Sequence, residues 1–167
     1  MSNGRFRALP SSDKTVPRRV GLISDTHGLL RPEALEFLRG AEHIIHAGDI
    51  GNPEILEELG ALAPVTAVRG NNDRDRWAVR IPATAMVKIG SVSIYVLHNL
   101  AELDLDASKF HVVVSGHSHK PVVKEVDGVL YVNPGSAGPR RFTLPIAVGE
   151  LRISGEAVRA RIHGLRI

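Results

Sequence analysis

Five short apolar runs in this sequence each end in aspartate, asparagine or histidine, and this repeated ending constrains the fold more than any other feature. In the first and the last of them, Val20-Gly21-Leu22-Ile23 leads into Ser24-Asp25-Thr26-His27-Gly28, and Val112-Val113-Val114 leads into Ser115-Gly116-His117-Ser118-His119. Apolar runs of this length, bounded by polar residues, are typical of buried strands. The chain is therefore predicted to place these polar side chains where strands end.

The first half of the chain alternates strand and helix patterns. Strands are predicted at 20–23, from Ile44 onward and at 65–68, and a helix is predicted from Pro32 to about Arg39. A second helix should begin at Asn52-Pro53-Glu54, which offers an N-cap, a proline and an acid, and should end near Gly60. Such alternation predicts parallel strands joined by helical crossovers.

The second half changes to hairpin patterns. Apolar runs flank three short turn sequences, Gly90-Ser91, Asp127-Gly128 and Ser154-Gly155. We therefore predict an α/β (α+β) fold, in which a two-sheet β-sandwich of mixed sheets is flanked by helices. One domain at 19–167 is expected, behind a flexible basic tail at 1–18.

Charge and composition exclude several classes of partner. The formal net charge is +3, but residues 1–19 hold five basic residues and one acidic residue, so the rest of the chain is near neutral. No basic patch with interleaved aromatics supports a nucleic-acid partner. The absence of cysteine excludes disulfides and thiolate metal sites, and no apolar run reaches the roughly 20 residues that span a bilayer. These features favour a cytoplasmic protein without a membrane partner.

Parallel strands bring their carboxyl ends to one edge of a sheet, so the side chains that end the runs are expected to converge. The expected cluster holds seven donors, which are Asp25, His27, Asp49, Asn71, His98, His117 and His119. Oxygen and imidazole donors without sulfur suit Mn²⁺, Fe or Zn²⁺ and are too rich in nitrogen for Mg²⁺ or Ca²⁺. Seven donors exceed the four of a structural zinc site and suffice for two ions if one carboxylate bridges them.

Each motif alone also fits a plain structural role. An Asp-x-His after a strand is usually a helix cap, and a Gly-Asp is usually a turn. Only the combination at successive strand ends favours a metal centre. The other histidines are predicted to be structural or at the surface, and they are His43, His46, His111 and His163.

The order of these motifs resembles the calcineurin-like metallophosphoesterases, in particular their small bacterial and archaeal phosphodiesterase branch. The family pattern is Asp-x-His, Gly-Asp, Gly-Asn-x-Asp/Glu, His and Gly-His-x-His, and here it runs in order from Asp25 to His119. A further match is Asn133-Pro134-Gly135-Ser136. The resemblance covers residues 20–162 and implies a two-sheet sandwich with a dinuclear site on one edge.

The resemblance also implies a role for each donor. Asp25, His27 and His119 would hold one ion. The other ion would be held by Asn71, His98 and His117, and Asp49 would bridge the two. Asp73 would orient its neighbours by hydrogen bonds. The expected cofactors are two divalent ions, with Mn²⁺ in first place and Fe, Ni or Zn as alternatives.

Three more residues are predicted to act on the substrate. Larger relatives carry a histidine at position 72 that can protonate the leaving group, whereas Asn72 has no titratable proton to give. We therefore expect the rate to depend steeply on the leaving group. Arg140 and Arg141, just after the Asn-Pro-Gly-Ser turn, are candidates to hold substrate oxygens, and two surface arginines in a loop explain them equally well.

The predicted function is that of a metal-dependent phosphoesterase, and more finely of a phosphodiesterase that attacks a small phosphate ester with hydroxide bound to two metals. A non-catalytic protein-binding scaffold of the same fold is the main alternative. A structural metal protein and a metal-dependent hydrolase acting on carbon centres, such as an amidase, are two others. The sequence leaves the substrate and the oligomeric state open, a homo-oligomer included.

Overall fold

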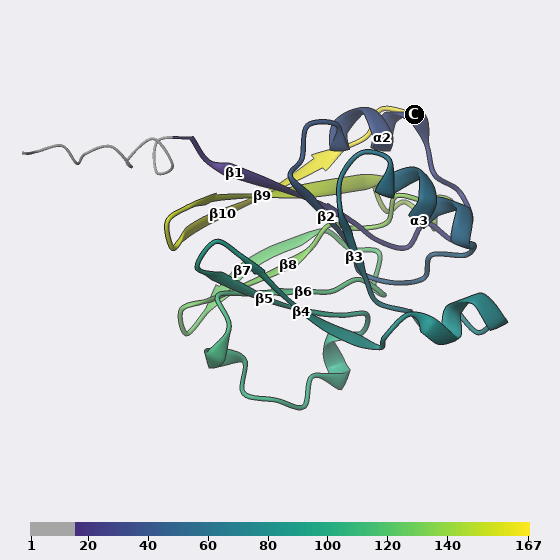
Figure 1. Ribbon diagram of the computed structural model, residues 1–167. Coiled ribbons are helices and arrows are strands. Elements are labelled where there is room, and N and C mark those ends of the chain that lie inside the picture. Colours follow the sequence, from purple (N-terminus) through teal and green to yellow (C-terminus); the bar gives the residue numbers. More distant parts are fainter. Residues whose placement is uncertain (1–15) are drawn as a thin grey trace, which may run out of the picture.

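The structure is a computed structural model that describes residues 16–167. Positions 1–15 of the predicted tail lie outside the described residues. Two five-stranded sheets are stacked face to face, and helices lie on their outer sides (Figure 1). This confirms the predicted sandwich of mixed sheets. No helix within residues 16–167 is long and apolar enough to cross a membrane.

The first sheet has the strand order β10-β9-β1-β2-β3. Its elements are β1 (Arg18–Ile23), α2 (Pro32–Leu38), β2 (His43–His46), α3 (Pro53–Gly60), β3 (Val65–Ala67), β9 (Ala147–Ser154) and β10 (Ala157–Gly164). Strands β1, β2 and β3 are parallel, with α2 and α3 as the crossovers between them. As expected, Asn52 caps α3, and its side chain accepts a hydrogen bond from the N–H of Ile55.

The second sheet has the order β4-β5-β6-β8-β7. Its strands are β4 (Thr84–Ile89), β5 (Val92–Leu97), β6 (Val112–Val114), β7 (Val122–Val126) and β8 (Val129–Asn133). The three central strands are parallel, and an antiparallel hairpin partner closes each edge. Three short 3₁₀ helices complete the described chain, and they are η2 (Arg76–Arg80), η3 (Leu100–Glu102) and η4 (Ala107–Lys109).

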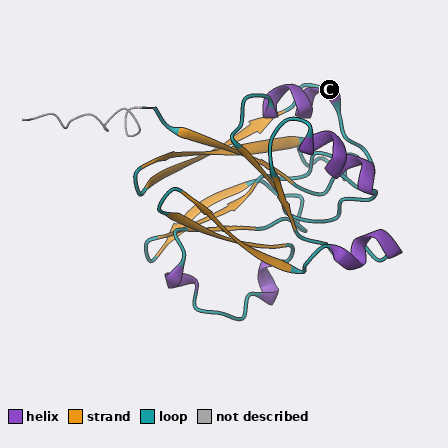
Figure 2. Ribbon diagram, in the orientation of Figure 1, coloured by secondary structure: helices purple, strands orange, loops and turns teal. Residues whose placement is uncertain are grey.

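Three apolar clusters hold the layers together. Between the sheets, residues such as Leu22 and Ile45 pack against Ile94 and Val114, all fully buried. A second cluster packs α2 and α3 onto the outer face of the first sheet. On the outer face of the second sheet, Tyr95 and its neighbours are covered by the segment that contains η3 and η4 (Figure 2). The edge of the sandwich at the strand ends is left for polar residues.

Candidate metal centre

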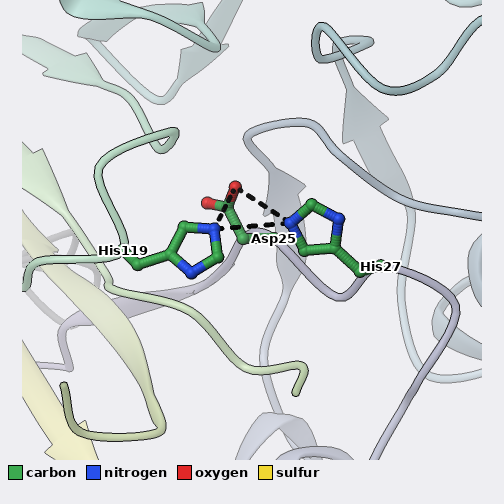
Figure 3. A group of neighbouring side chains, drawn as sticks. All are labelled: Asp25, His27 and His119. Carbon is green, nitrogen blue, oxygen red and sulfur yellow. Dashed lines mark hydrogen bonds and ion pairs between the residues drawn. The ribbon is translucent and has the colours of Figure 1, made fainter. Parts of the chain in front are cut away.

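The first donor group consists of Asp25, His27 and His119 (Figure 3). Asp25 and His27 follow β1, and His119 follows β6 of the other sheet. The Nε2 atoms of His27 and His119 lie 3.3 Å apart. Asp25 Oδ1 lies 3.3 Å from Nε2 of His119 and 3.8 Å from Nε2 of His27. Three potential ligand atoms thus face one point, as the first predicted ligand set requires.

The second donor group shares Asp25 and adds Asp49 and His98, which follow β2 and β5. His98 Nε2 lies 3.3 Å from Asp49 Oδ2 and 3.9 Å from Asp25 Oδ1. Asp49 Oδ2 also lies 3.6 Å from Nε2 of His27. The Asp49 carboxylate therefore lies between the two groups, where a bridging ligand would have to be.

The remaining two predicted ligands, Asn71 and His117, extend the second group toward solvent. Their side chains are in contact, with Asn71 Oδ1 3.2 Å from His117 Nδ1. The rings of His98 and His117 meet edge to face at a centroid distance of 5.2 Å. The structure thus brings all seven predicted donors into one continuous cluster, although Asn71 and His117 are exposed and the other five are not.

The chemistry of this cluster fits divalent cations. Asp25 Oδ1 and His98 Nε2 are buried, and neither atom has a hydrogen-bond partner among residues 16–167. The other ring nitrogen of His98, Nδ1, lies 2.7 Å from the carbonyl of Ala47. That geometry makes Nδ1 the protonated nitrogen and leaves the lone pair of Nε2 facing the carboxylates, which is the usual arrangement of a metal-binding histidine. A cation would satisfy both buried atoms.

The backbone of the cluster adopts an unusual conformation. Five of the donors have positive φ angles, at 55° for Asp25, 46° for His27, 56° for Asp49, 69° for His117 and 63° for His119. Non-glycine residues rarely adopt this left-handed conformation, and it costs on the order of 1–3 kcal/mol at each site. Such strain concentrates at functional sites, where the surrounding structure enforces it.

Two glycines let the loops approach closely enough to form the cluster. A side chain at position 70 would collide with the carboxylate and backbone of Asp49. A side chain at position 116 would collide with Ser24 and with Asp25 Oδ2. The requirement for glycine here comes from contact with the candidate ligands rather than from turn geometry.

The cluster also changes the protonation of its members. Burial raises the pKa of Asp49, but the contact with His98 and the N–H of Asn72 outweigh burial and lower that pKa to about 2. Burial lowers the pKa of His98, and the Asp49 carboxylate outweighs it, so the pKa of His98 is raised. The pKa of His27 is lowered, because burial outweighs the nearby carboxylates. Asp49 is thus ready to bind a cation, and a cation at His98 competes with a proton for the Nε2 lone pair.

Asp73 and Asn72 contact the ligand loops directly. The buried Asp73 carboxylate accepts hydrogen bonds from the N–H groups of Ile50, Gly51 and Gly70, at 2.8–3.1 Å. Asn72 donates from its backbone N–H to Asp49 Oδ1 at 2.9 Å and from its side chain to Asp49 Oδ2 at 3.1 Å. The sequence did not indicate this second contact, by which Asn72 holds the carboxylate between the two donor groups.

Arg140 and Arg141 are exposed and lie outside the donor cluster. Arg140 donates to the carbonyl of Leu144 at 3.3 Å within its own loop. Burial is the main cause of the lowered pKa of His27, and the charge of Arg141 is close enough to lower that pKa further. Of the two, Arg141 is therefore the better placed to meet an anion at the first donor group.

Sequence reasoning missed the residues that hold the loops in place. Asn133, 6% exposed, donates from Nδ2 to the carbonyl of Gly116 at 2.8 Å and to Ser118 Oγ at 3.1 Å. Ser24 Oγ donates to Asp25 Oδ2 at 2.6 Å. The Asn-Pro-Gly-Ser motif could have pointed to Asn133, because the motif matched the family pattern but no role was predicted for its residues.

His46 was expected to be structural or at the surface, and the structure places it fully buried behind the ligand loops. Its Nδ1 accepts from the N–H of Gly48 at 3.1 Å, so Nε2 carries the proton and donates to Thr26 Oγ1 at 2.9 Å. Thr26 Oγ1 in turn donates to the carbonyl of Ile50 at 2.8 Å. This chain of bonds ties the loop after β1 to the loop after β2.

Comparison with known proteins agrees with this fold. The model of the calcineurin-like phosphoesterase superfamily domain matches residues 19–156. The chain therefore belongs to the calcineurin-like phosphoesterase superfamily. Membership implies the use of divalent metal ions, and the two donor groups are candidate positions for them.

Individual relatives place the chain in the small archaeal and bacterial branch. A probable metallophosphoesterase of Methanothermobacter thermautotrophicus is 38% identical over 158 residues, which cover 86% of this chain and 90% of the relative. A phosphodiesterase of Methanocaldococcus jannaschii is 30% identical over 137 residues, covering 70% and 82%.

Two solved structures show the same fold. An archaeal phosphodiesterase matches with a TM-score of 0.72 at 28% identity, over 87% of this chain and 99% of the other. Vacuolar protein sorting 29 from Cryptosporidium parvum matches with a TM-score of 0.77 at 23% identity, over 90% and 93%. The second likeness concerns the fold alone.

Proposed function

We propose that this protein is a metal-dependent phosphodiesterase that uses two divalent ions. The observation that carries the proposal is the shared use of carboxylates, since Asp25 belongs to both donor groups. Asp49 Oδ2 lies within 3.6 Å of imidazoles from both groups. When bound, two ions would supply a hydroxide nucleophile at neutral pH and positive charge for the phosphoryl oxygens.

The assignment of ligands keeps the sets that the family resemblance implies, in which Asp49 rather than Asp25 is the bridge. Asp25, His27 and His119 would hold one ion, Asn71, His98 and His117 would hold the other, and Asp49 would bridge the two. Mn²⁺ is the first choice for both positions, because the donors are oxygen and imidazole nitrogen. Fe, Ni and Zn are the alternatives.

The other residues near the cluster orient groups and bind substrate. Asn72 fixes the bridging carboxylate through its two hydrogen bonds, and Asp73 holds the adjoining backbone at Ile50 and Gly51. Arg141 attracts the phosphate ester to the first donor group, and Arg140 holds its loop. The Asn72 amide is committed to Asp49 and has no titratable proton, so the departing alkoxide is not protonated from this position. A diester with a good leaving group is the expected substrate.

A protein-binding scaffold is the second candidate function. The fold likeness to vacuolar protein sorting 29, a protein named for sorting rather than for hydrolysis, favours it. The complete set of seven donors in this chain favours catalysis. The two candidates differ in whether the metal-loaded protein turns over any ester.

The deciding experiment uses metal-stripped protein reconstituted separately with Mn²⁺, Fe²⁺, Ni²⁺, Zn²⁺ or Mg²⁺. Hydrolysis of bis-p-nitrophenyl phosphate and of p-nitrophenyl phosphate is then compared. We expect metal-dependent release of nitrophenolate, greater for the diester, and its loss in Asp49→Ala. Full metal occupancy without hydrolysis of either ester would contradict the proposal and favour the scaffold.

A further inference from the structure

A pocket of about 320 Å³ opens beside the second donor group. Three of the proposed ligands line it, and they are Asn71, His98 and His117. The buried Nε2 of His98, which has no hydrogen-bond partner within residues 16–167, marks the metal end of the pocket, next to which the phosphoryl group would be held. At about 30 Å³ for each water-sized group, the pocket has room for roughly ten such groups beyond that point. One ester arm of a diester would therefore extend into it.

The lining of this pocket is unevenly charged. It contains two carboxylates, those of Glu102 and Asp104, and one guanidinium, that of Arg69. Arg69 is already held by a hydrogen bond of 2.6 Å from NH1 to the carbonyl of Ile81. Neither carboxylate has a hydrogen bond or an ion pair with another side chain within residues 16–167. With neutral histidines, the lining has an excess of one negative charge.

The two carboxylates are held in place by an alternating sequence. In Glu102-Leu103-Asp104-Leu105, the leucines pack against the cluster of Tyr95 and Val113 on the outer face of the second sheet. The two acids that alternate with these leucines are exposed and line the pocket. The segment that contains η3 and η4 lies against this sheet (Figure 1). The acids therefore stand on an anchored segment.

We infer that Glu102 and Asp104 select a phosphodiester in which one ester arm carries a positive charge, such as an alkylammonium group. The inference rests on the proposed phosphodiesterase function. The phosphoryl group lies at the metal end of the pocket, and the cationic arm reaches the two carboxylates. An arm with a second anion is repelled by the same charges. Glu102 and Asp104 are specificity residues and take no part in the chemical step.

The kinetic test compares three diesters with the same p-nitrophenyl leaving group. Their second arms are ethyl, 2-(trimethylammonio)ethyl and 2-carboxyethyl, so only the charge of the arm changes. We expect kcat/KM of the Mn²⁺-loaded protein to be about 5- to 30-fold higher for the ammonium arm than for ethyl, as two exposed ion pairs would provide. The carboxylate arm should be the slowest. In Glu102→Gln/Asp104→Asn the ammonium-to-ethyl ratio should fall to within about twofold of unity.

The matched control is Glu57→Gln/Glu58→Gln. It removes the same charge from exposed positions of α3, which lie outside the pocket lining. The control should keep the ratio of the natural protein. A ratio near unity in the natural protein, or a ratio that survives in Glu102→Gln/Asp104→Asn, would overturn the inference.

A binding measurement separates this inference from the proposed function. Calorimetry on Mn²⁺-loaded protein compares phosphocholine with ethyl phosphate, neither of which is a diester. Phosphocholine should bind about 5- to 30-fold more tightly, and the advantage should vanish in Glu102→Gln/Asp104→Asn. If no diester is hydrolysed but this difference is found, the proposed function fails and the cationic subsite stands. Equal affinities, or no binding of either compound, would refute the subsite.

Discussion

Replacement of Asn133 by alanine tests how the metal loop is held. The turn from Gly116 to His119 carries two proposed ligands, His117 and His119, both with left-handed backbone. Asn133 spans this turn with its two donated hydrogen bonds, and its Oδ1 accepts a third bond from the N–H of Gly135 at 2.9 Å. An alanine at position 133 makes none of these bonds, so its side chain no longer opposes relaxation of the turn.

The magnitude follows from the bonds that are lost. Each net hydrogen bond contributes about 0.5–1.5 kcal/mol, and the N–H of Gly135 is left unpaired in a buried position. Asn133→Ala should therefore lower the free energy of unfolding by about 2–3 kcal/mol. For a domain of this size that corresponds to a decrease in Tm of about 4–12 °C. Loss of a residue that orients metal ligands typically weakens metal binding by about 10–100-fold.

The assay measures both quantities on the same protein. Thermal unfolding of the metal-free form gives the stability, and titration with Mn²⁺ gives the metal affinity. Asn52→Ala is the matched control, because it removes the N-cap of α3 and should cost about 1 kcal/mol without changing metal affinity. If Asn133→Ala lowers Tm but binds Mn²⁺ within twofold of the natural protein, the positioning argument is wrong.

Four further predictions test other parts of the structure. Asp49→Ala should lose both ions and His27→Ala mainly one, as elemental analysis of reconstituted protein would report; equal losses would argue against a bridging Asp49. Burial lowers the pKa of His46 to about 4, so only the unfolded chain takes up a proton there as the pH falls below about 6.5. The metal-free protein should therefore lose up to about 3 kcal/mol of stability between pH 6.5 and 4, measured by urea unfolding, and His46→Gln should flatten that slope. A plot of log kcat/KM against leaving-group pKa should be steep, and Asn72→His should help alkyl esters more than nitrophenyl esters; a flat plot would mean that another group supplies the proton. Removal of residues 1–15, which are polar and basic in sequence, should change neither Tm nor turnover, and a large loss of either would show that they contribute to the domain.

The local elements of this protein follow from its sequence. Both crossover helices begin at a proline, and two of the three hairpins turn at the predicted pairs, whereas the third turns at Gly155-Glu156, one residue later than predicted, because Ser154 pairs with Ala157 as the last residue of β9. The donor residues were found for the same reason, since Asp25, Asp49 and His98 each follow an apolar run that ends near the same edge. These features depend on neighbours in the chain, which a single sequence displays directly.

The tertiary structure decided what depends on contacts between distant segments. The C-terminal hairpin β9–β10 pairs with β1 rather than with the second sheet, and only the order of strands shows this. The contacts of Asn133 with the turn at Gly116 and of Asn72 with Asp49 join loops that are 17 and 23 residues apart. The carboxylates of Glu102 and Asp104 line a pocket because the alternating Leu103 and Leu105 pack on a sheet. A sequence gives the types of such residues, but folding alone brings their atoms within bonding distance.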